Sequence, residues 1–394
     1  MKKIGIVTVH HYHNYGSMLQ AFATQYALEK MCKCKAEIID VCPPGMFYAS
    51  KEIYDFEHPS DYDFCMKTFR KKNTAKSRVL DFLHHSRIFR TIQWIYNNKN
   101  KEKVNYGEFT SFRTNYHLSQ KTYRTEDLYD HAPKYDGYVV ASDQVWNAFI
   151  TFNNPVYFLT FAYPNAPKMA YASSIGLPEI PQNAQKDFVK GIKNLDYISL
   201  REKESAMLTT QMTGRMAKHV LDPTLLLDKQ DWETVADKSS EIGDYVLTYF
   251  LQPTDFMYKL AEKVAKDLGI KLIHIEPSKQ YSKDGITFSG PITVEKWLRL
   301  FMDARIVVTN SFHGMAFSTN FNIPFITTLR WKNSKIDMNS RHRSLIEQFH
   351  YESQFVKEGE FPTQDKYNFD YSEVNKILDD ARKDSIAFLT QISK

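Results

Sequence analysis

The stretch Ile306-Val307-Val308-Thr309-Asn310-Ser311-Phe312-His313-Gly314 carries the clearest indication of the fold. Its first four residues are β-branched, as in a strand buried inside a parallel sheet, and a helical pattern follows Gly314. At such a junction, free backbone N–H groups and the positive end of a helix dipole lie at the carboxyl edge of the sheet. Because anions bind there in open α/β folds, the stretch predicts a doubly wound α/β domain with an anion site.

The same alternation of strands and helices extends over the rest of the chain. Strand-length apolar runs occupy residues 4–9, 37–41, 137–141, 168–172, 197–200, 219–221, 245–250, 271–275, 306–309 and 325–329. Helical spacing occupies residues 17–30, 255–268, 293–302, 372–392 and a segment near Met315. A length of 394 residues suits two domains. Two doubly wound, Rossmann-like α/β domains are the simplest arrangement of these elements.

Composition suggests where the domains begin and end. We expect an N-terminal domain over residues 1–228, a C-terminal domain over residues 229–370 and a C-terminal helix over residues 371–394. The polar segment 227–244 is typical of a link between domains. Residues from about 43 to 116 fit neither half of the pattern and predict an insertion into the first domain.

Cysteine usage and hydropathy indicate the compartment. Hydrophobic residues make up 43% and charged residues 25% of the chain, which is ordinary for a globular protein. All four cysteines lie in the first sixth of the sequence, too few and too clustered for the disulfide framework of a secreted protein. No run of about 18 uncharged apolar residues is present. We therefore expect a cytoplasmic protein.

Charge is unevenly distributed along the chain. The net charge is +5, but residues 67–103 contain eleven Lys or Arg residues against two acidic ones. This basic segment also carries aromatic residues near helical spacing, so it could lie on the inner face of an anionic membrane or hold a lipid pyrophosphate. A solvated helix face is the alternative. No nucleic-acid-binding module is recognisable and the isoelectric point is only about 8.7, so we expect no nucleic-acid partner.

His313 is the first candidate catalytic residue. A histidine beside an anion at a helix start can give or take a proton near neutral pH. Ser311 can cap the helix, and Ser311, Phe312 and Gly314 are candidate substrate-binding residues because they build the anion site. From spacing alone, a capping Ser311 and a structural His313 explain the stretch equally well.

A second strand end is followed by Ser142-Asp143-Gln144-Val145-Trp146-Asn147. Asp143 is a candidate catalytic base towards a hydroxyl group, and Trp146 is placed to stack on a sugar ring. Gln144 and Asn147 add amide groups as further substrate-binding candidates. The alternative is that Asp143 caps a helix and Trp146 lies in the core.

Polar residues follow two other predicted strands. After the first strand, Asn14, Tyr15 and Gly16 form a glycine turn before a capped helix and are candidate substrate-binding residues. Arg201 directly follows another strand and is well placed to grip a carboxylate or a phosphate in a bidentate manner. Arg341 lies near a predicted helix start and offers a second cation. For both arginines, a solvated salt bridge is the alternative.

Motifs for nucleotide and metal binding are missing. The chain contains neither G-x-x-x-x-G-K-[ST] nor G-x-G-x-x-G, so nucleotide cofactors lose their usual sequence support. Three histidines among residues 10–13 lie near Cys32, Cys34 and Cys42, but no paired C-x-x-C or H-E-x-x-H accompanies them. We therefore expect no cofactor and no metal ion.

Seven short motifs follow one another along the chain. They are Asn-Tyr-Gly-Ser-Met-Leu-Gln-Ala from Asn14, Ser-Asp-Gln-Val-Trp-Asn from Ser142, Tyr-Ala-Ser-Ser-Ile-Gly from Tyr171, Ser-Leu-Arg-Glu-Lys from Ser199, Leu-Asp-Pro-Thr-Leu-Leu from Leu221, Ser-Phe-His-Gly from Ser311 and Asn-Ser-Arg from Asn339. Their order and spacing resemble the polysaccharide pyruvyl transferase family over roughly residues 4–350.

The resemblance implies a fold like that of GT-B glycosyltransferases, in which two Rossmann-like domains face a cleft. It also implies an enzyme that transfers pyruvate from phosphoenolpyruvate to a sugar of a surface polysaccharide as a ketal, with the acceptor on the N-terminal domain and the donor on the C-terminal domain. Carried over by motif, His313 and Arg201 match positions tied to donor binding or catalysis, and Arg341 stands at the Asn-Ser-Arg position. Ala141 replaces a glycine that many members have before Ser-Asp-Gln.

The formation of a ketal from phosphoenolpyruvate requires an acid, a base and cations, which are the residue types selected above. We hypothesise that an acid protonates the methylene carbon of phosphoenolpyruvate, that a sugar hydroxyl attacks the resulting cationic centre, and that phosphate then leaves while a second hydroxyl closes the ring. Arg201, Arg341 and the helix start at residues 311–314 would bind the phosphate and the carboxylate. His313 would transfer the proton, and Asp143 would accept the proton of the sugar hydroxyl.

Two other function classes stay open at this point. A glycosyltransferase with a nucleotide-sugar donor would use the same two-domain architecture, because a fold does not decide a function, and a non-catalytic sugar-binding protein is the third class. The acceptor is equally open between galactose, glucose and N-acetylhexosamine. The basic insertion motivates the hypothesis that the acceptor is linked to polyprenyl pyrophosphate, with Lys71, Lys72, Arg87 and Arg90 contacting the membrane.

Overall fold

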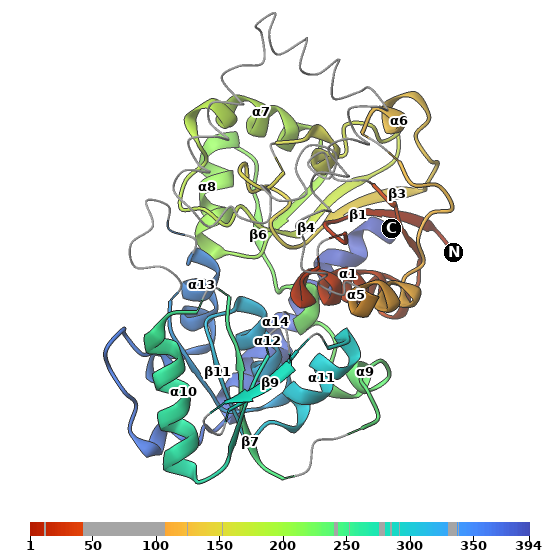
Figure 1. Ribbon diagram of the computed structural model, residues 1–394. Helices are drawn as coiled ribbons and strands as arrows, with labels where there is room; N and C mark the ends of the chain where they lie inside the picture. Colours follow the sequence, from red (N-terminus) through yellow and green to blue (C-terminus); the bar gives the residue numbers. More distant parts are fainter. Residues whose placement is uncertain are drawn as a thin grey trace, which may run out of the picture.

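The computed structural model describes residues 1–11, 13–41, 107–123, 125–151, 153–239, 243–251, 253–275, 280–283, 286–290, 292–329, 337 and 339–394. These residues form two parallel-sheet α/β domains, one above the other in Figure 1. The basic segment 67–103, with the four residues expected to contact a membrane, lies outside the described residues.

The first sheet has six parallel strands in the order β2-β1-β3-β4-β5-β6. The strands are β1 (Lys3–Val7), β2 (Lys35–Ile38), β3 (Gly137–Ala141), β4 (Lys168–Ser173), β5 (Tyr197–Leu200) and β6 (Lys218–His219). The described helices of this half are α1 (Tyr15–Lys30), α5 (Gly107–Phe112), α6 (Thr125–Asp130), α7 (Gln182–Lys193) and α8 (Lys203–Thr213). Each strand lies within a few residues of its predicted position.

The second sheet also has six strands, in the order β12-β11-β7-β8-β10-β9. They are β7 (Tyr245–Tyr249), β8 (Lys271–His274), β9 (Gln280–Lys283), β10 (Ile286–Ser289), β11 (Ile306–Thr309) and β12 (Phe325–Thr327). Its helices are α9 (Lys229–Glu233), α10 (Asp255–Leu268), α11 (Val294–Asp303), α12 (Phe312–Phe321), α13 (Ser340–Phe349) and α14 (Ser372–Leu389). Among the strands that the structure describes, only β9 is antiparallel to its neighbour, which is β10. The strands β9 and β10 were not predicted, because each has only four residues and neither contains a continuous apolar run.

Two helices lie where the domains meet and are buried on nearly all sides. In α1, the buried residues continue around the helix, and all ten residues of α12 are buried. Their small polar side chains are satisfied within the helix, as when Thr24 donates to the Gln20 carbonyl and Ser318 to the Gly314 carbonyl. A helix that is buried all round needs no polar face, which explains why α1 and α12 lack amphipathic patterns.

The chain between the two sheets is packed rather than open. It contains the 3₁₀ turn η4 (Pro223–Leu225) and α9, and Trp232 of α9 is buried against Phe317 of α12, with ring centroids 5.0 Å apart. Since one hydrophobic cluster contains residues of both domains, the domains share a continuous core. Part of the segment predicted as a linker is therefore core structure.

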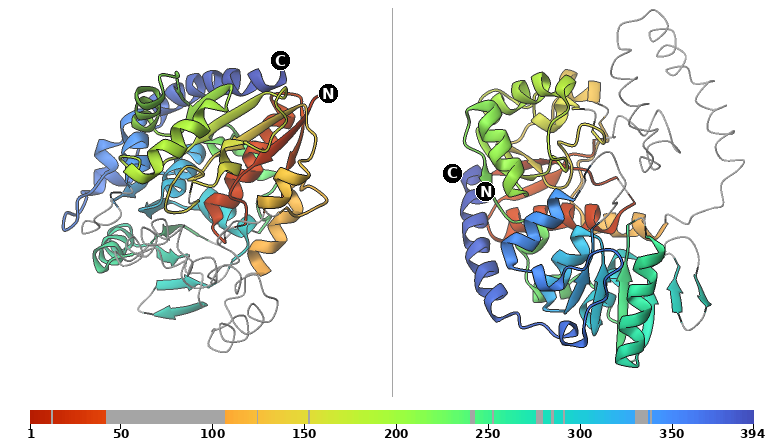
Figure 2. Two further views of the ribbon diagram at one scale, coloured as in Figure 1. Left: turned by 90° about the horizontal axis from the view of Figure 1, so that it is seen from above. Right: turned by 90° about the vertical axis from the view of Figure 1, so that its left-hand side faces the viewer.

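The C-terminal helix α14 connects the second domain back to the first. The Leu221 backbone N–H donates to Ser385 at 3.0 Å, and Arg382 donates to the Leu225 carbonyl at 2.7 Å and to Asn320 at 2.7 Å. Both views of Figure 2 place the two chain termini side by side. Helix α14 thus holds η4 in place through a hydrogen bond from Arg382.

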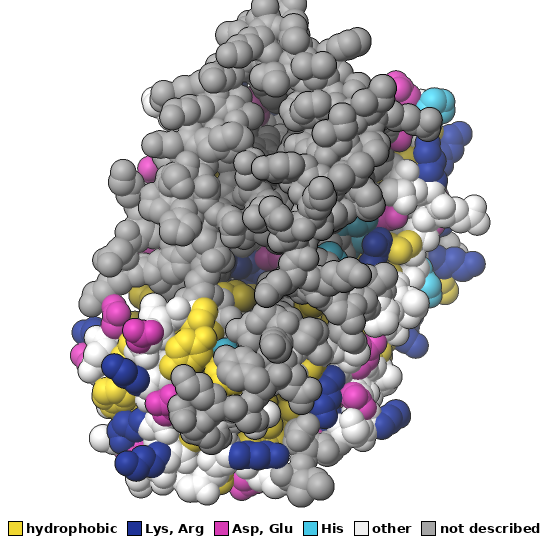
Figure 3. Space-filling view, in the orientation of Figure 1, with side chains coloured by type: hydrophobic (Ala, Val, Ile, Leu, Met, Phe, Trp, Pro, Cys, Tyr) yellow, Lys and Arg dark blue, Asp and Glu magenta, His cyan; other side chains and the backbone are white. Residues whose placement is uncertain are grey.

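The described surface carries charges of both signs. On the face seen in Figure 3, Lys and Arg side chains alternate with Asp and Glu side chains over the C-terminal domain. None of the described helices combines the length and the apolar composition needed to cross a membrane.

Candidate active site

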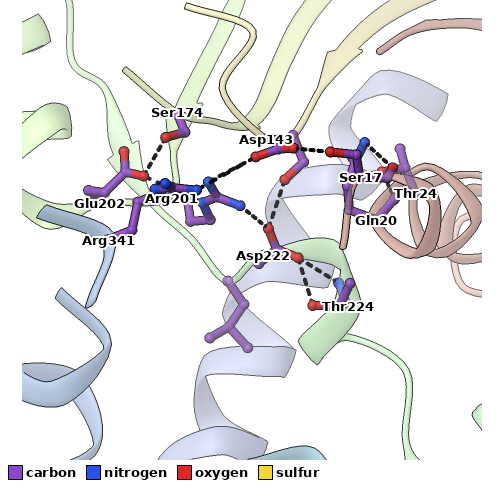
Figure 4. Close-up of polar contacts among 12 residues, drawn as sticks. Ser17, Gln20, Thr24, Asp143, Ser174, Arg201, Glu202, Asp222, Thr224 and Arg341 are labelled. Atoms are coloured by element: carbon purple, nitrogen blue, oxygen red, sulfur yellow. Dashed lines mark hydrogen bonds and ion pairs between the residues drawn. The ribbon is translucent and has the colours of Figure 1, made fainter. Parts of the chain in front are cut away.

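The predicted motifs meet where the carboxyl edges of the two sheets approach each other. Figure 4 shows residues that follow β3, β5 and β6 converging with residues from α1 and from the start of α13. Their side chains form a buried cluster of carboxylates and guanidinium groups. The cluster draws on both domains, so it depends on how the domains pack.

The junction between β11 and α12 is held rigidly by its own polar residues. The Asn310 side chain accepts from the Leu251 backbone N–H and donates to the Leu251 carbonyl, both at 2.7 Å. Ser311 caps α12 by accepting from the Gly314 N–H at 3.4 Å. A Cβ atom built on Gly314 would lie 3.0 Å from Cβ of Thr309 and still closer to its hydroxyl oxygen. Ser311 and Gly314 therefore shape the junction.

His313 lies in the first turn of α12 and packs against Gly16 at the start of α1. A Cβ atom on Gly16 would lie 2.5 Å from Cε1 of His313 and closer still to Nδ1 and Cγ, so only glycine leaves room for this ring. Burial lowers the pKa of His313 to about 4, although Asp222 and Asp143 oppose the shift. Among the described residues, the buried Nε2 atom has no hydrogen-bond partner. A buried polar atom without a hydrogen-bond partner lowers the free energy of unfolding by about 1–3 kcal/mol. Such a cost marks His313 as a candidate for contact with a substrate.

Asp143 sits on a backbone segment with an unusual conformation. Ser142 and Asp143 have φ angles of 43° and 54°, in the left-handed region that non-glycine residues rarely adopt. Such strain is concentrated at functional sites. Ser17 donates to Oδ2 of Asp143 at 2.6 Å, and Arg201 lies 3.4 Å from Oδ1. Asp143 therefore caps no helix, and the capping role considered from the sequence is wrong.

The charge on Asp143 is strongly stabilised. Burial opposes ionisation, but Arg201, His313 and Arg341 lower its pKa to about 2. A general base works best when its pKa is near the working pH. Asp143 is consequently a weak base in this structure and is better suited to orienting the two arginines than to the predicted proton abstraction.

Arg201 is the centre of the cluster and is only 4% exposed. Its Nη1 atom donates to Asp222 at 2.8 Å, and its Nε atom donates to Glu202 at 3.4 Å. Its guanidinium carbon lies 4.3 Å from the centroid of the Phe312 ring. The solvated salt bridge considered from the sequence is therefore wrong, and Phe312 serves as a platform for this cation.

Sequence reasoning did not select Asp222 as a site residue. It caps η4 by accepting from the Thr224 N–H at 3.0 Å, and its other oxygen accepts from Arg201 and from Ser142. The signal was present in the Leu-Asp-Pro-Thr-Leu-Leu motif, because aspartate before proline is typical of a capped turn. Asp222 links Arg201 directly to the turn between the domains.

Arg341 occupies the second position of α13 and is 5% exposed. Its Nη1 atom lies 3.9 Å from Oδ1 of Asp143. A small pocket between the domains is lined by Arg201, Asp222, Phe312, Arg341, Ser344 and Gln348. The structure thus brings His313, Asp143, Arg201 and Arg341 together in one cluster.

Other predicted substrate-binding residues have packing roles. Trp146 is 1% exposed, stacks on Phe158 with centroids 5.6 Å apart and donates from Nε1 to the Tyr157 carbonyl at 3.0 Å. It lies in the core and cannot stack on a sugar, so that prediction is wrong. Asn147 is fully buried and donates to Gln144 at 2.8 Å, which stabilises their own loop.

The first strand end also supports the domain interface. Asn14 caps α1 by accepting from the Ser17 N–H at 3.1 Å. Tyr15 is buried, stacks on Trp297 of the other domain at 5.6 Å and donates to the Ile292 carbonyl at 3.1 Å. In this structure, Tyr15 fastens the start of α1 to the C-terminal domain.

The fold and the site define the class of the protein. Two Rossmann-like domains with facing sheet edges, and a cluster of charged residues between them, confirm the predicted GT-B-like architecture.

The sequence assigns the chain to a family within this class. The chain belongs to the polysaccharide pyruvyl transferase family, whose family model matches residues 14–333. No match was found among curated proteins.

Comparison with solved structures found similar proteins at low sequence identity and with TM-scores below 0.5. UDP-GlcNAc 2-epimerase from Methanocaldococcus jannaschii is 12% identical with a TM-score of 0.47, over 96% of this chain and 93% of that one. UDP-GlcNAc 2-epimerase from Neisseria meningitidis is 9% identical with a TM-score of 0.44, over 100% and 98%. The E. coli heptosyltransferase WaaC with ADP is 12% identical with a TM-score of 0.39, over 96% and 99%.

Proposed function

We propose that this protein transfers pyruvate from phosphoenolpyruvate to a sugar of a surface polysaccharide, or of its lipid-linked precursor, and forms a pyruvate ketal. Membership of the pyruvyl transferase family supports the reaction class. The observation that carries the proposal is the buried Nε2 atom of His313, which has no partner in the described residues and lies in a cluster with two arginines. Such an atom is suited to a reacting group of a substrate.

Donor binding requires cations for a phosphate and a carboxylate. Arg341 and Arg201 both line the pocket between the domains, and Arg201 is held by Asp222 at 2.8 Å. Breaking a short buried ion pair such as that between Arg201 and Asp222 is costly. We therefore assign Arg341 to direct contact with the donor and Arg201 to the donor side of the site, where it stays anchored on Asp222.

His313 must gain a proton before it can act as the acid. Its pKa of about 4 leaves it neutral near pH 7 in the free protein. A bound anion favours the charged imidazolium, so phosphoenolpyruvate would raise this pKa on binding. His313 then passes its proton to the methylene carbon, a sugar hydroxyl attacks the adjacent carbon, and this hydroxyl returns a proton to the now neutral His313. Phosphate then leaves as a second hydroxyl of the sugar closes the ketal ring, and the proton of that hydroxyl leaves with the phosphate. Binding of the donor is accordingly coupled to proton uptake.

The acceptor belongs on the N-terminal side of the cluster in this proposal, and the donor on the C-terminal side. A polyprenyl-pyrophosphate-linked acceptor at the inner membrane face would explain the basic segment 67–103. Replacing Lys71, Lys72, Arg87 and Arg90 by glutamine should weaken binding to anionic vesicles. Unchanged partitioning would remove this part of the proposal.

The reaction is tested by measuring phosphate release from phosphoenolpyruvate with a panel of galactosides, glucosides and N-acetylhexosaminides, followed by mass spectrometry of the sugar. A product that carries a pyruvate ketal supports the proposal. His313→Ala should abolish turnover while circular dichroism shows a folded chain, and Glu373→Gln on the exposed face of α14 is the matched control. Absence of phosphate release with every acceptor, together with binding of a uridine or guanosine diphosphate, would favour a nucleotide-sugar enzyme instead.

A further inference from the structure

A second cluster of polar side chains lies at the end of β1, outside the group around His313. It consists of His10 and His11, which follow β1, and of Asp40, which follows β2. One possible ligand atom from each residue lies within 4.8 Å of the other two. The Nε2 atoms of both histidines are 2.9 Å from the same oxygen, Oδ1 of Asp40. Parallel pairing of β1 with β2 brings these residues together although about thirty positions separate them along the chain.

Both ring nitrogens of His10 face hydrogen-bond acceptors, and one of these two contacts needs an explanation. Its Nδ1 atom lies 3.1 Å from the Thr8 carbonyl oxygen, which can only accept a hydrogen bond. Its Nε2 atom lies 2.9 Å from the Asp40 carboxylate, which is also an acceptor. A neutral imidazole carries one N–H, so it can satisfy only one of these contacts. The other contact requires either a second proton or a cation.

His11 shows a similar feature. Its Nε2 atom approaches Oδ1 of Asp40 at 2.9 Å, yet it makes no hydrogen bond in the part of the chain that the structure describes. The side chain is largely buried. Two imidazole nitrogens thus converge on one carboxylate oxygen.

The surroundings hold these three side chains in place. Thr122 donates to Oδ2 of Asp40 at 2.6 Å, and the Asp40 backbone N–H donates to Ser119 at 2.9 Å. The Thr8 carbonyl orients His10 so that Nε2 faces Asp40. Metal-binding histidines and carboxylates are commonly held by such outer hydrogen bonds, which fix the ring orientation and the tautomer.

We propose that His10, His11 and Asp40 bind a divalent transition-metal ion of the zinc class, with a further coordination position open. Two imidazole nitrogens and one carboxylate oxygen are a donor set that such ions accept. The ion would take the place of a second proton on His10 and would connect the segments that follow β1 and β2. Arg113, whose Nη2 atom lies 3.1 Å from Oδ1 of Asp40, is the competing positive charge. The proposal is independent of the pyruvyl transfer reaction.

A titration of the full chain with Zn²⁺ tests the site. The protein is stripped with a chelator, carries no affinity tag, and is titrated by isothermal calorimetry with the metal ion alone. We expect one equivalent to bind to the wild-type chain. His11→Ala should weaken binding by about 100-fold or more, since loss of an outer partner alone costs about 10–100-fold. Thr122→Val removes only such an outer partner and should weaken binding by about tenfold.

Two control variants distinguish binding by these three side chains from a disturbance of the loop that carries the histidines. His13 follows on the same loop but lies outside the cluster, so His13→Ala should bind Zn²⁺ like the wild type. Arg113→Gln removes the neighbouring positive charge and should tighten binding. Equal losses in the His11 and His13 variants would overturn the proposal, because they would indicate a general effect on the loop.

X-ray absorption spectroscopy of the zinc-loaded wild-type chain needs no variant and remains valid if a variant fails to fold. A first shell of nitrogen and oxygen supports the site, and a shell that contains sulfur overturns it, since Cys32 and Cys34 could then be the ligands. Absence of stoichiometric binding by the folded wild-type chain would also refute the site. In that case a second proton on the His10 ring, and no metal ion, would join it to both the Thr8 carbonyl and Asp40.

Discussion

Gly16→Ala combined with His313→Ala tests the central contact between the two domains. In the wild-type background, a Cβ atom at position 16 would lie 2.5 Å from Cε1 of His313, whereas ordinary contacts begin at 3.4 Å. The imidazole or the start of α1 must therefore shift by about 0.9 Å or more. Overpacking of this kind costs about 1–3 kcal/mol of unfolding free energy. In the His313→Ala background, the ring is absent and the clash disappears.

The double-mutant cycle turns this contact into a measurable number. We expect Gly16→Ala to destabilise the wild type by about 1–3 kcal/mol and to be neutral or stabilising by up to about 1 kcal/mol in the His313→Ala background, because alanine is the better helix former. Urea unfolding of the four proteins gives the coupling free energy. The same shift of about 1 Å should lower pyruvyl transfer by about 100-fold in the single variant. Equal effects of Gly16→Ala in both backgrounds would refute the placement of His313 against Gly16.

The buried groups give three further predictions. Because burial lowers the pKa of His313 to about 4, the unfolded chain takes up the proton at a higher pH than the folded chain, and His313 lowers the free energy of unfolding as the pH falls from about 6.5 to 4. His313→Gln should reduce this loss by about 3 kcal/mol in urea unfolding at several pH values. An unchanged pH dependence would contradict the burial of His313. Asp222→Asn should destabilise the chain by about 1–3 kcal/mol in thermal unfolding, since it removes the negative charge that pairs with Arg201 at 2.8 Å. The exposed Glu373→Gln should change stability by less than about 0.5 kcal/mol. Trp146→Phe should lower stability and leave the acceptor KM unchanged; a raised KM at normal stability would restore the sugar-stacking role.

Local patterns in the sequence were enough to predict most of the fold. The β-branched run at residues 306–309 and the capped helix after it occur as β11 and α12, because strand and helix periods depend on residues close together in the chain. The pair β9 and β10 escaped prediction because each strand has only four residues, and the apolar alternation of β10 (Ile286 and Phe288) is too short to stand out. Its pairing is stabilised by the neighbouring β8.

The selection of His313, Asp143, Arg201 and Arg341 also came from sequence, through strand ends and family motifs. Their chemical roles did not. The pKa of Asp143 is low because two arginines from separate segments surround it, and no local pattern reports that distance. Trp146 was misread for the same reason, since a tryptophan after a strand can face either a ligand or the core.

Only the tertiary structure decided which side chains meet across the chain. Gly16 and His313 lie on opposite domains, and His10 and Asp40 come from different strands, so their contacts depend on domain packing and on the order of strands in the sheet. The sequence alone determined the elements and the residue types at their ends. Burial and the proximity of charges, which set the protonation state and the ligands of each group, arise only when the whole chain is folded.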